Sequence, residues 1–122
     1  MKHLKLFENK VSLLNLVEQI KTQNYKFVED VLKNKDVDIN STIGNSIKVP
    51  LISTVNDIGM LELLTKYGAD WFMKDHSGKN FIDRLENVKS ENKIKILKYV
   101  KWKYSEKYQE HLTRKETDKY NL

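Results

Sequence analysis

Cysteine is absent from the 122-residue sequence, which also has only one proline and four glycines. The lack of cysteine excludes disulfides, thiol catalysis and cysteine-ligated zinc. So few prolines and glycines leave few positions at which a helix would be interrupted. No apolar run approaches the roughly 20 residues of a membrane span. Charge precedes any long apolar stretch at the N-terminus, so we also expect no signal peptide and predict a cytoplasmic protein.

Composition favours one soluble domain with an uneven charge. Hydrophobic residues make up 39% of the chain and charged residues 32%, which suits a globular protein. The net charge is +5: residues 1–88 hold 12 basic and 12 acidic side chains, whereas residues 89–122 hold 10 and 5. Lysine outnumbers arginine 20 to 2, a bias that accompanies A/T-rich genomes. Any attraction for anions is therefore expected in the last quarter of the chain.

Apolar residues recur at helical spacing through most of the chain. The pattern predicts a helix from Ser12 to residue 21, a second over 25–32, a short one opened by Pro50, and one from Met60 to Tyr67. A further helix begins at Phe81, and a last, long one begins near Glu91. Polar clusters separate them, and Asn56-Asp57-Ile58-Gly59 is interpreted as a break. Two segment pairs also match 32 residues apart: Val31-Leu32 with Leu63-Leu64, and Val37-Asp38-Ile39 with Ala69-Asp70-Trp71.

The segment 67–85, YGADWFMKDHSGKNFIDRL, joins a helix end, a glycine, an extended bulky run at 71–73, a turn at 75–78 and a helix start. It resembles the junction of ankyrin repeats through Gly68, Ala69, Asp70, Asp75, Gly78 and Ile82, and departs from it at Phe81, Asp83 and Leu85. The resemblance implies that Asp70 orients the turn through hydrogen bonds to the backbone. Pro50 stands where the family has the proline of its Thr-Pro-Leu motif.

The resemblance implies an all-α fold, an ankyrin-like α-solenoid of helix-turn-helix repeats with short β-turn or hairpin junctions. The predicted domain covers residues 1–113, with repeats at about 9–40, 41–72 and 73–112. A single long C-terminal helix caps the last repeat on a buried stripe of Ile94, Leu97, Val100, Tyr104 and Tyr108. Residues 114–122 are expected to fray.

Residues suited to catalysis or metal binding are scattered. His3, His76 and His111 fall in three different elements with no carboxylate at ligand spacing, so we expect each to be a solvated surface histidine without a metal. Ser53, Thr54 and Ser77 have no recognisable base or oxyanion hole nearby. The four glycines are isolated and form no phosphate loop. These patterns predict no enzyme activity and no cofactor.

The turn tips and inner helices of ankyrin proteins bind other proteins, and the resemblance places the corresponding face on this chain. The predicted partner-binding residues are Phe72, Met73, Lys74, His76, Lys79, Asn45 and Lys48. Trp71 is expected to pack inward. An exposed Phe72 beside Met73 would make a binding anchor, and the alternative, left open here, is that both pack against the first hairpin.

A second hypothesis concerns the lysine-rich C-terminal helix. Lysines could neutralise phosphates while aromatic rings stack on bases. This alternative nucleic-acid face consists of Lys95, Lys98, Trp102, Lys103 and Lys107. A solvated lysine face on a capping helix explains the same pattern and is favoured. Self-association through this helix is a further expectation, and no membrane contact is expected.

The leading functional prediction is therefore a non-enzymatic module that binds and blocks a larger protein, as an inhibitor or adaptor. A phage or bacterial antagonist of a host protein is one concrete version, acting in the cytoplasm of the source cell or its host. The sequence does not identify the partner.

Overall fold

The structure, a computed structural model, describes residues 13–120, and most of this part of the chain is helical, as the all-α prediction requires. None of the helices in it is long and apolar enough to cross a membrane. The predicted N-cap, Ser12, lies outside the described residues. The helical elements are a helix over residues 13–21, α2 (Tyr25–Lys33), the 3-10 helix η1 (Leu51–Thr54), α3 (Ile58–Lys66), α4 (Phe81–Asn87), α5 (Glu91–Lys103) and α6 (Ser105–Tyr120).

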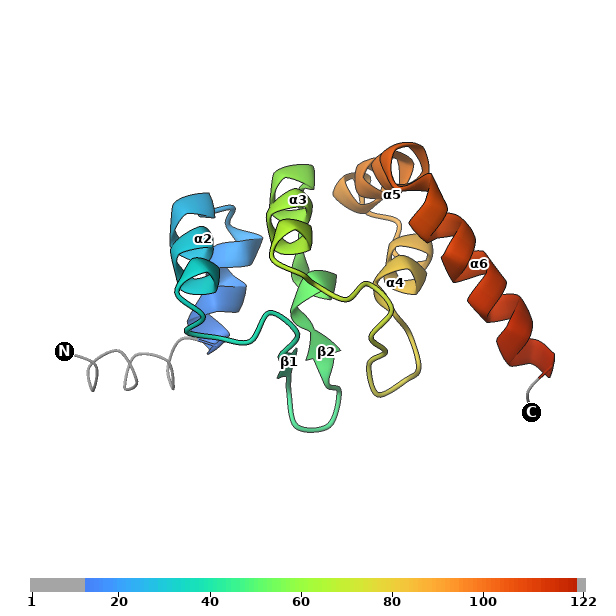
Figure 1. The fold of residues 1–122 in the computed structure, drawn as a ribbon, viewed down its shortest axis with the longest axis horizontal. Helices are drawn as coiled ribbons and strands as arrows, with labels where there is room; N and C mark the ends of the chain where they lie inside the picture. Colours follow the sequence, from blue (N-terminus) through green and yellow to red (C-terminus); the bar gives the residue numbers. More distant parts are fainter. Residues whose placement is uncertain (1–12, 121–122) are drawn as a thin grey trace.

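One small hairpin completes the fold. Strands β1 (Thr42–Ile43) and β2 (Val49–Pro50) pair antiparallel, with Thr42 opposite Pro50 and Ile43 opposite Val49. Figure 1 shows α2, α3 and α5 in one row, while the hairpin and the loop before α4 project to the same side of the molecule. α6 descends from the end of α5 beside α4 and that loop. This loop side is where the two predicted tips lie.

The core runs from the helix over residues 13–21 to α5. Leu16, Val28, Leu61 and Ile82 are fully buried in one continuous apolar cluster, although they come from four different helices. Trp71 is only 1% exposed and contacts the rings of Phe81 and Tyr104 edge to face. The prediction that Trp71 packs inward is therefore confirmed.

The C-terminal helix departs from the prediction in two ways. It is interrupted at Tyr104, whose backbone (φ −114°, ψ 42°) ends α5 before α6 begins. Helix α6 then continues to Tyr120, so the prediction that residues 114–122 fray is wrong for the described part. The Tyr104 hydroxyl bonds Glu62 and its ring packs on Trp71. These tertiary contacts fix the bend, because no glycine or proline follows Gly78 in the sequence.

The face that α5 buries also differs from the predicted stripe. Ile94 is 45% exposed, and Ile96, at 1%, is buried instead together with Val100. Both isoleucines fit a helical period, so spacing alone could not choose between them. The partly buried Leu97, Tyr104 and Tyr108 pack against the core cluster as predicted.

Three local predictions also need correction. Gly59 lies inside α3, which begins at Ile58, rather than in a break. Pro50 ends β2 and precedes η1 with an extended backbone (ψ 149°), so it is the N-cap of η1 and not, as predicted, the first helical residue. Residues 71 and 72 form a turn, because the Asp70 carboxylate accepts a hydrogen bond from the Phe72 amide at 2.9 Å. That bond confirms the turn-orienting role expected of Asp70.

Three helix ends use a left-handed residue: Gln23 follows the helix over residues 13–21 with φ +65°, and only one of the other two is glycine. Gly68 follows α3 with φ +94°, and Lys35 follows α2 with φ +58°. A side chain in this conformation costs about 1 kcal/mol. We therefore expect Lys35→Gly to raise the free energy of unfolding by up to about 1 kcal/mol and Gly68→Ala to lower it by about the same amount. Urea denaturation of both variants checks this, and a loss of stability in Lys35→Gly would contradict it.

Candidate functional site

A cleft of about 680 Å³ separates α6 from the loop that precedes α4. One wall comes from residues 72–83 and the other from residues 111–119 of α6. Its lining residues are Phe72, Lys74, Gly78, Lys79, Asn80, Asp83, His111, Thr113, Arg114, Lys115, Thr117, Asp118 and Lys119. Five of these side chains are cationic and two are anionic, so the cleft carries a formal charge of +3 with neutral histidine.

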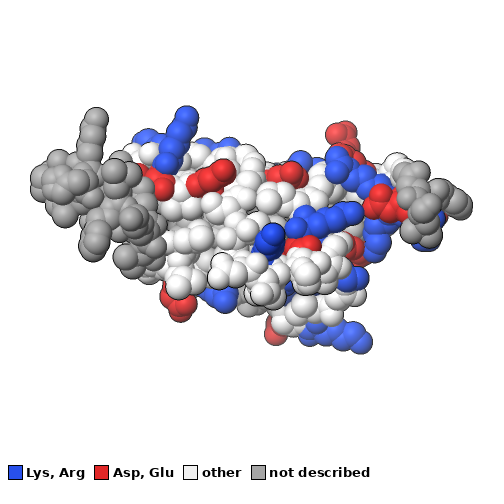
Figure 2. Space-filling view, turned by 90° about the horizontal axis from the view of Figure 1, so that it is seen from below, with Lys and Arg blue, Asp and Glu red and all other residues white. Residues whose placement is uncertain are grey.

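The positive charge of the cleft belongs to one end of the molecule. Figure 2, which views the loop side, shows blue side chains gathered towards the end formed by α6, while the middle is mostly free of charge. Two of the cations are paired inside the cleft: Lys115 with Asp83 at 3.1 Å, and Lys74 with Asp118 at 3.4 Å. The remaining excess comes from Lys79, Arg114 and Lys119.

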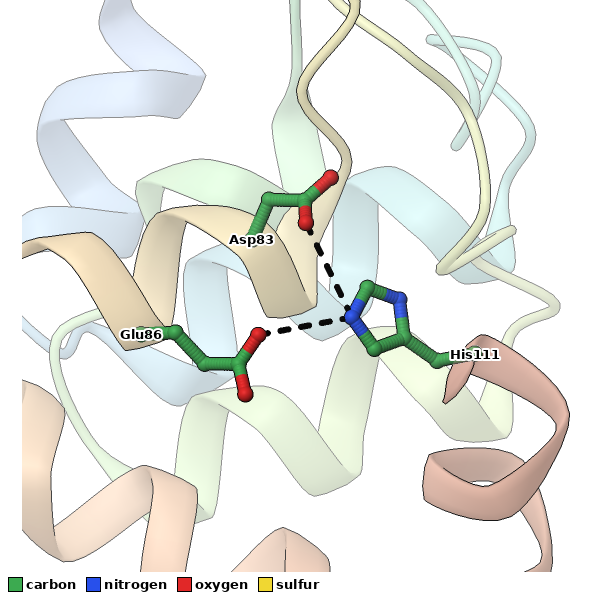
Figure 3. A group of neighbouring side chains, drawn as sticks. All are labelled: Asp83, Glu86 and His111. Carbon is green, nitrogen blue, oxygen red and sulfur yellow. Dashed lines mark ion pairs between the residues drawn. The ribbon is translucent and has the colours of Figure 1, made fainter. Parts of the chain in front are cut away.

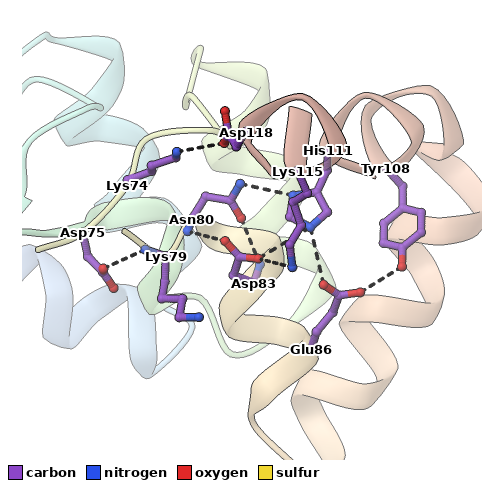
Figure 4. Close-up of polar contacts among 10 residues, drawn as sticks. All are labelled: Lys74, Asp75, Lys79, Asn80, Asp83, Glu86, Tyr108, His111, Lys115 and Asp118. Atoms are coloured by element: carbon purple, nitrogen blue, oxygen red, sulfur yellow. Dashed lines mark hydrogen bonds and ion pairs between the residues drawn. The ribbon is translucent and has the colours of Figure 1, made fainter. Parts of the chain in front are cut away.

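A buried polar cluster forms the floor of the cleft and joins α6 to α4 (Figure 4). His111, on α6, is fully buried, so its prediction as a surface histidine is wrong. Its Nδ1 lies 3.2 Å from Asn80 Nδ2, and its Nε2 lies 3.4 Å from Glu86 Oε1 and 3.7 Å from Asp83 Oδ1. Sequence spacing gave no sign of this group, because the histidine and its partners are about 30 positions apart in the chain.

The carboxylates of this cluster are held by further bonds. Burial alone would raise the pKa of Asp83, but the hydrogen bond from the Asn80 amide and the pairing with Lys115 outweigh that effect and lower it. Tyr108 donates its hydroxyl proton to Glu86 at 2.9 Å. Burial and that hydrogen bond raise the pKa of Tyr108. The cluster therefore joins α4 and α6, and its carboxylates are already paired or hydrogen-bonded within the protein.

Asp83, Glu86 and His111 bring three potential metal ligands within 4.8 Å of one another (Figure 3). The sequence predicted no such group. Coordination through Nε2 requires a free electron pair on that nitrogen.

The position of the proton on the His111 ring follows from the hydrogen bonds at the start of α4. Asn80 Oδ1 accepts from the Asp83 amide at 2.9 Å, and Asp83 Oδ2 accepts from the Asn80 amide at 3.1 Å, which is a reciprocal capping box.

This cap fixes the tautomer of His111. With Asn80 Oδ1 committed to the helix, only its amide nitrogen faces Nδ1, and an amide nitrogen is a donor. Nδ1 must accept, so the ring proton sits on Nε2 and points towards the two carboxylates. The arrangement suits a neutral histidine that holds two helices together better than a metal ligand.

The tautomer can be tested by a variant that keeps the cap. Asn80→Asp retains the oxygen that caps α4 but replaces the amide nitrogen with a second oxygen. We expect the ring proton of wild-type His111 to lie on Nε2, and Nδ1 of the variant to carry a proton that it donates to the new oxygen. Long-range ¹H–¹⁵N NMR of the ring reads both nitrogens, with the exposed His76 as internal reference. A proton on Nδ1 in the wild type would contradict the assignment.

Asp75 organises the loop that forms the other wall. Its Oδ1 accepts from the amides of Ser77 (2.8 Å) and Lys79 (3.0 Å), and its Oδ2 accepts from Arg84 Nε at 2.9 Å. Burial would raise the pKa of this carboxyl, but the bonds from Lys79, Ser77 and Arg84 prevail and lower the pKa to about 2. Gly78, with φ +79°, completes the turn predicted at 75–78.

The structure brings part of the predicted partner-binding set into the cleft and leaves the rest at the tips. Phe72, Lys74 and Lys79 line the cleft. Phe72 is half-buried and does not stand free, because the Arg114 guanidinium covers its ring at 4.2 Å from the centroid. Met73 is half-buried.

The remaining predicted residues belong to the two tips. The His76 amide donates to the Ile47 carbonyl at 2.9 Å, which joins the tips. We define the tip face as Asn45, Ile47, Lys48, His76 and Lys79, all of which are exposed.

The alternative nucleic-acid face is divided by intramolecular contacts. Lys103 is paired with Glu62, and Lys107 lies 5.4 Å from the Trp71 ring centroid and 5.9 Å from that of Phe72. Lys95 pairs with Glu91 at 3.6 Å in an exposed contact. Trp102 is 75% exposed. Two of the four lysines therefore serve the fold.

The cations of α6 that line the cleft, Arg114, Lys115 and Lys119, are absent from the predictions because residues 114–122 are expected to fray. A local signal for helix was present in the spacing of opposite charges. Glu110 and Arg114 are four apart and bonded at 2.6 Å, and Glu116 and Lys119 are three apart at 3.7 Å. Such pairs stabilise helices modestly.

Comparison with known proteins adds no relative: no protein-family model matches the chain, and no curated protein and no solved structure is significantly similar to it. Function must therefore be inferred from the geometry.

Proposed function

We propose that the chain is a non-enzymatic protein-binding module of stacked, ankyrin-like helix pairs, which acts as an inhibitor or adaptor by covering a surface of a larger protein. The observation that carries the proposal is the regular spacing of one row of helices. Helices α2, α3 and α5 begin at residues 25, 58 and 91, which are 33 residues apart each time. Such a period is typical of ankyrin repeats.

Equivalent contacts recur at the same period. Glu29 on α2 accepts hydrogen bonds from Lys66 and Tyr67 at the C-terminal end of α3, and Glu62 on α3 accepts one from Tyr99 on α5. The pairs Glu29–Lys66 and Glu62–Tyr99 both span 37 residues and are displaced by 33. Neighbouring helices are thus joined at the same positions, which supports units that stack in one direction.

The turns repeat as well. Asp38 Oδ1 accepts from the Asn40 amide at 2.9 Å, and Asp70 Oδ1 accepts from the Phe72 amide at 2.9 Å, 32 residues later. Asn40 also links the two turns, since its Oδ1 accepts from the Asp70 amide at 2.8 Å. These bonds set the loops side by side and leave the tip face open to a partner.

The polar cluster favours a structural role over catalysis. Each carboxylate of the cluster is bonded to a group that holds α4 or α6, and the His111 ring is fully buried. A general acid or base must reach a substrate proton. A binding role for the open tip face needs no such group.

The proposal is tested by partner capture with one exposed apolar residue changed at a time. The tagged chain is incubated with extract of the source cell or its host, with and without nuclease, at low and moderate salt. A partner protein retained after nuclease treatment is expected to be lost with Ile47→Asp, because Ile47 is an apolar side chain of the tip face and is 57% exposed. Loss of an apolar anchor typically costs more than 1 kcal/mol of binding.

Leu14→Asp is the matched control. Leu14 is 73% exposed but lies on the helix over residues 13–21, away from the tips. Capture is expected to survive this change. Equal loss in both variants would overturn the proposal. Recovery of nucleic acid alone would also overturn it and would favour the lysine face around Lys98 and Trp102.

A further inference from the structure

We infer that the cleft between α6 and the 72–80 loop binds an acidic, extended segment of the partner protein. The inference rests on the proposed function and assigns the chemistry of its partner. The cleft has five cationic side chains against two acidic ones within about 680 Å³. That charge is complementary to a run of carboxylates.

The cationic side chains of the cleft differ in their ion pairs. Arg114 and Lys119 pair with Glu110 and Glu116, acids on α6 that do not line the cleft. The ammonium group of Lys79 has no ion-pair partner among the described residues. Exposed pairs of this kind contribute about 1 kcal/mol or less. Carboxylates of a ligand can therefore compete for these three side chains.

The shape of the cleft suits an extended peptide. Its α6 wall runs from His111 to Lys119, which corresponds to roughly 12 Å at 1.5 Å per residue. An extended chain of about four residues has that length. A free phosphate ion would fill only a small part of this volume. Thr113 and Thr117 lie between the cations on the same wall and add polar surface.

The same wall is poorly suited to nucleic acid. Single strands are held by bases stacked on open aromatic rings. The His111 ring is fully buried, and the other aromatic ring among the lining side chains, that of Phe72, is covered by Arg114 at 4.2 Å, with Lys107 at 5.9 Å. No open ring remains there for a base, so a carboxylate-bearing peptide is favoured over a polynucleotide.

The test uses the full-length chain and three fluorescein-labelled probes: hexaglutamate, hexaglutamine and an oligothymidylate of the same charge as hexaglutamate. Fluorescence anisotropy is measured at low and moderate salt. We expect hexaglutamate to bind in a salt-dependent manner and hexaglutamine not to bind. The double variant Lys79→Glu/Lys119→Glu is expected to weaken hexaglutamate binding at least about tenfold. Its fold is checked by circular dichroism.

Lys95→Glu/Lys98→Glu is the matched control, because it changes the net charge equally on α5, outside the cleft. It is expected to leave hexaglutamate binding within about twofold of wild type. Equal loss in both double variants, no binding of hexaglutamate, or tighter binding of oligothymidylate would each overturn the inference. Partner capture that still depends on Ile47 while hexaglutamate fails to bind would overturn the inference alone and leave the proposed function standing.

Discussion

Replacing Trp71 by alanine is expected to lower the free energy of unfolding by about 3–5 kcal/mol, the usual cost of removing a large buried aromatic side chain. Trp71 is 1% exposed, and its ring lies 5.3 Å from that of Phe81 and 4.9 Å from that of Tyr104. Its Nε1 also donates to Thr65 Oγ1 at 3.0 Å. The ring thus connects α3, α4 and the α5–α6 bend, and its loss leaves a cavity where they meet.

The second tryptophan supplies the control for this prediction. Trp102 is 75% exposed, so Trp102→Ala is expected to change the stability by less than about 0.5 kcal/mol. Urea denaturation followed by circular dichroism compares both variants with wild type. Each variant keeps one tryptophan, which allows fluorescence to be assigned to the other site. A similar stability loss in the two variants would contradict the burial assigned to them.

Asp75→Asn is expected to lower the stability at neutral pH by about 2 kcal/mol and to flatten its decrease in acid. The pKa of this carboxyl is lowered to about 2 in the folded chain, compared with about 3.9 in an unfolded one. A carboxyl with a depressed folded pKa contributes fully above the unfolded value. Its contribution is lost as the pH falls from about 4 through about 2. Wild type should therefore lose more stability than the variant in that interval.

The measurement is a series of urea denaturations from pH 7 down to pH 2. Asp118→Asn is the control, because the Asp118 side chain is 60% exposed and pairs with Lys74 at 3.4 Å. That change is expected to cost less than about 0.5 kcal/mol at any pH. Parallel pH curves for wild type and Asp75→Asn would show that the loop does not depend on the ionised carboxylate.

Features encoded by neighbouring residues could be predicted from the sequence. The period of α2, the left-handed Gly68 and the turn at 75–78 each follow from a short pattern. The burial of Trp71 followed from its place in the junction pattern.

Features that depend on distant residues could not be predicted. His111 is buried because Asn80 and Asp83 lie beside it, and neither is near it in the sequence. The ring of Phe72 is covered by Arg114, which belongs to a helix that follows an unpredicted bend. That bend depends in turn on the contact of Tyr104 with Glu62. The cleft is formed by these tertiary contacts, so no local sequence pattern could predict it.

The two glutamates that join neighbouring helices are unequal, and this sets an order in which the chain should open. Glu29 receives two hydrogen bonds and its side chain is 41% exposed, whereas Glu62 receives bonds from Tyr99, Lys103 and Tyr104 and is 29% exposed. A force applied along the row loads these junctions in series, so the junction between α2 and α3 should yield first. In hydrogen exchange, the amides of α2 should then lose protection while those of α5 remain closed.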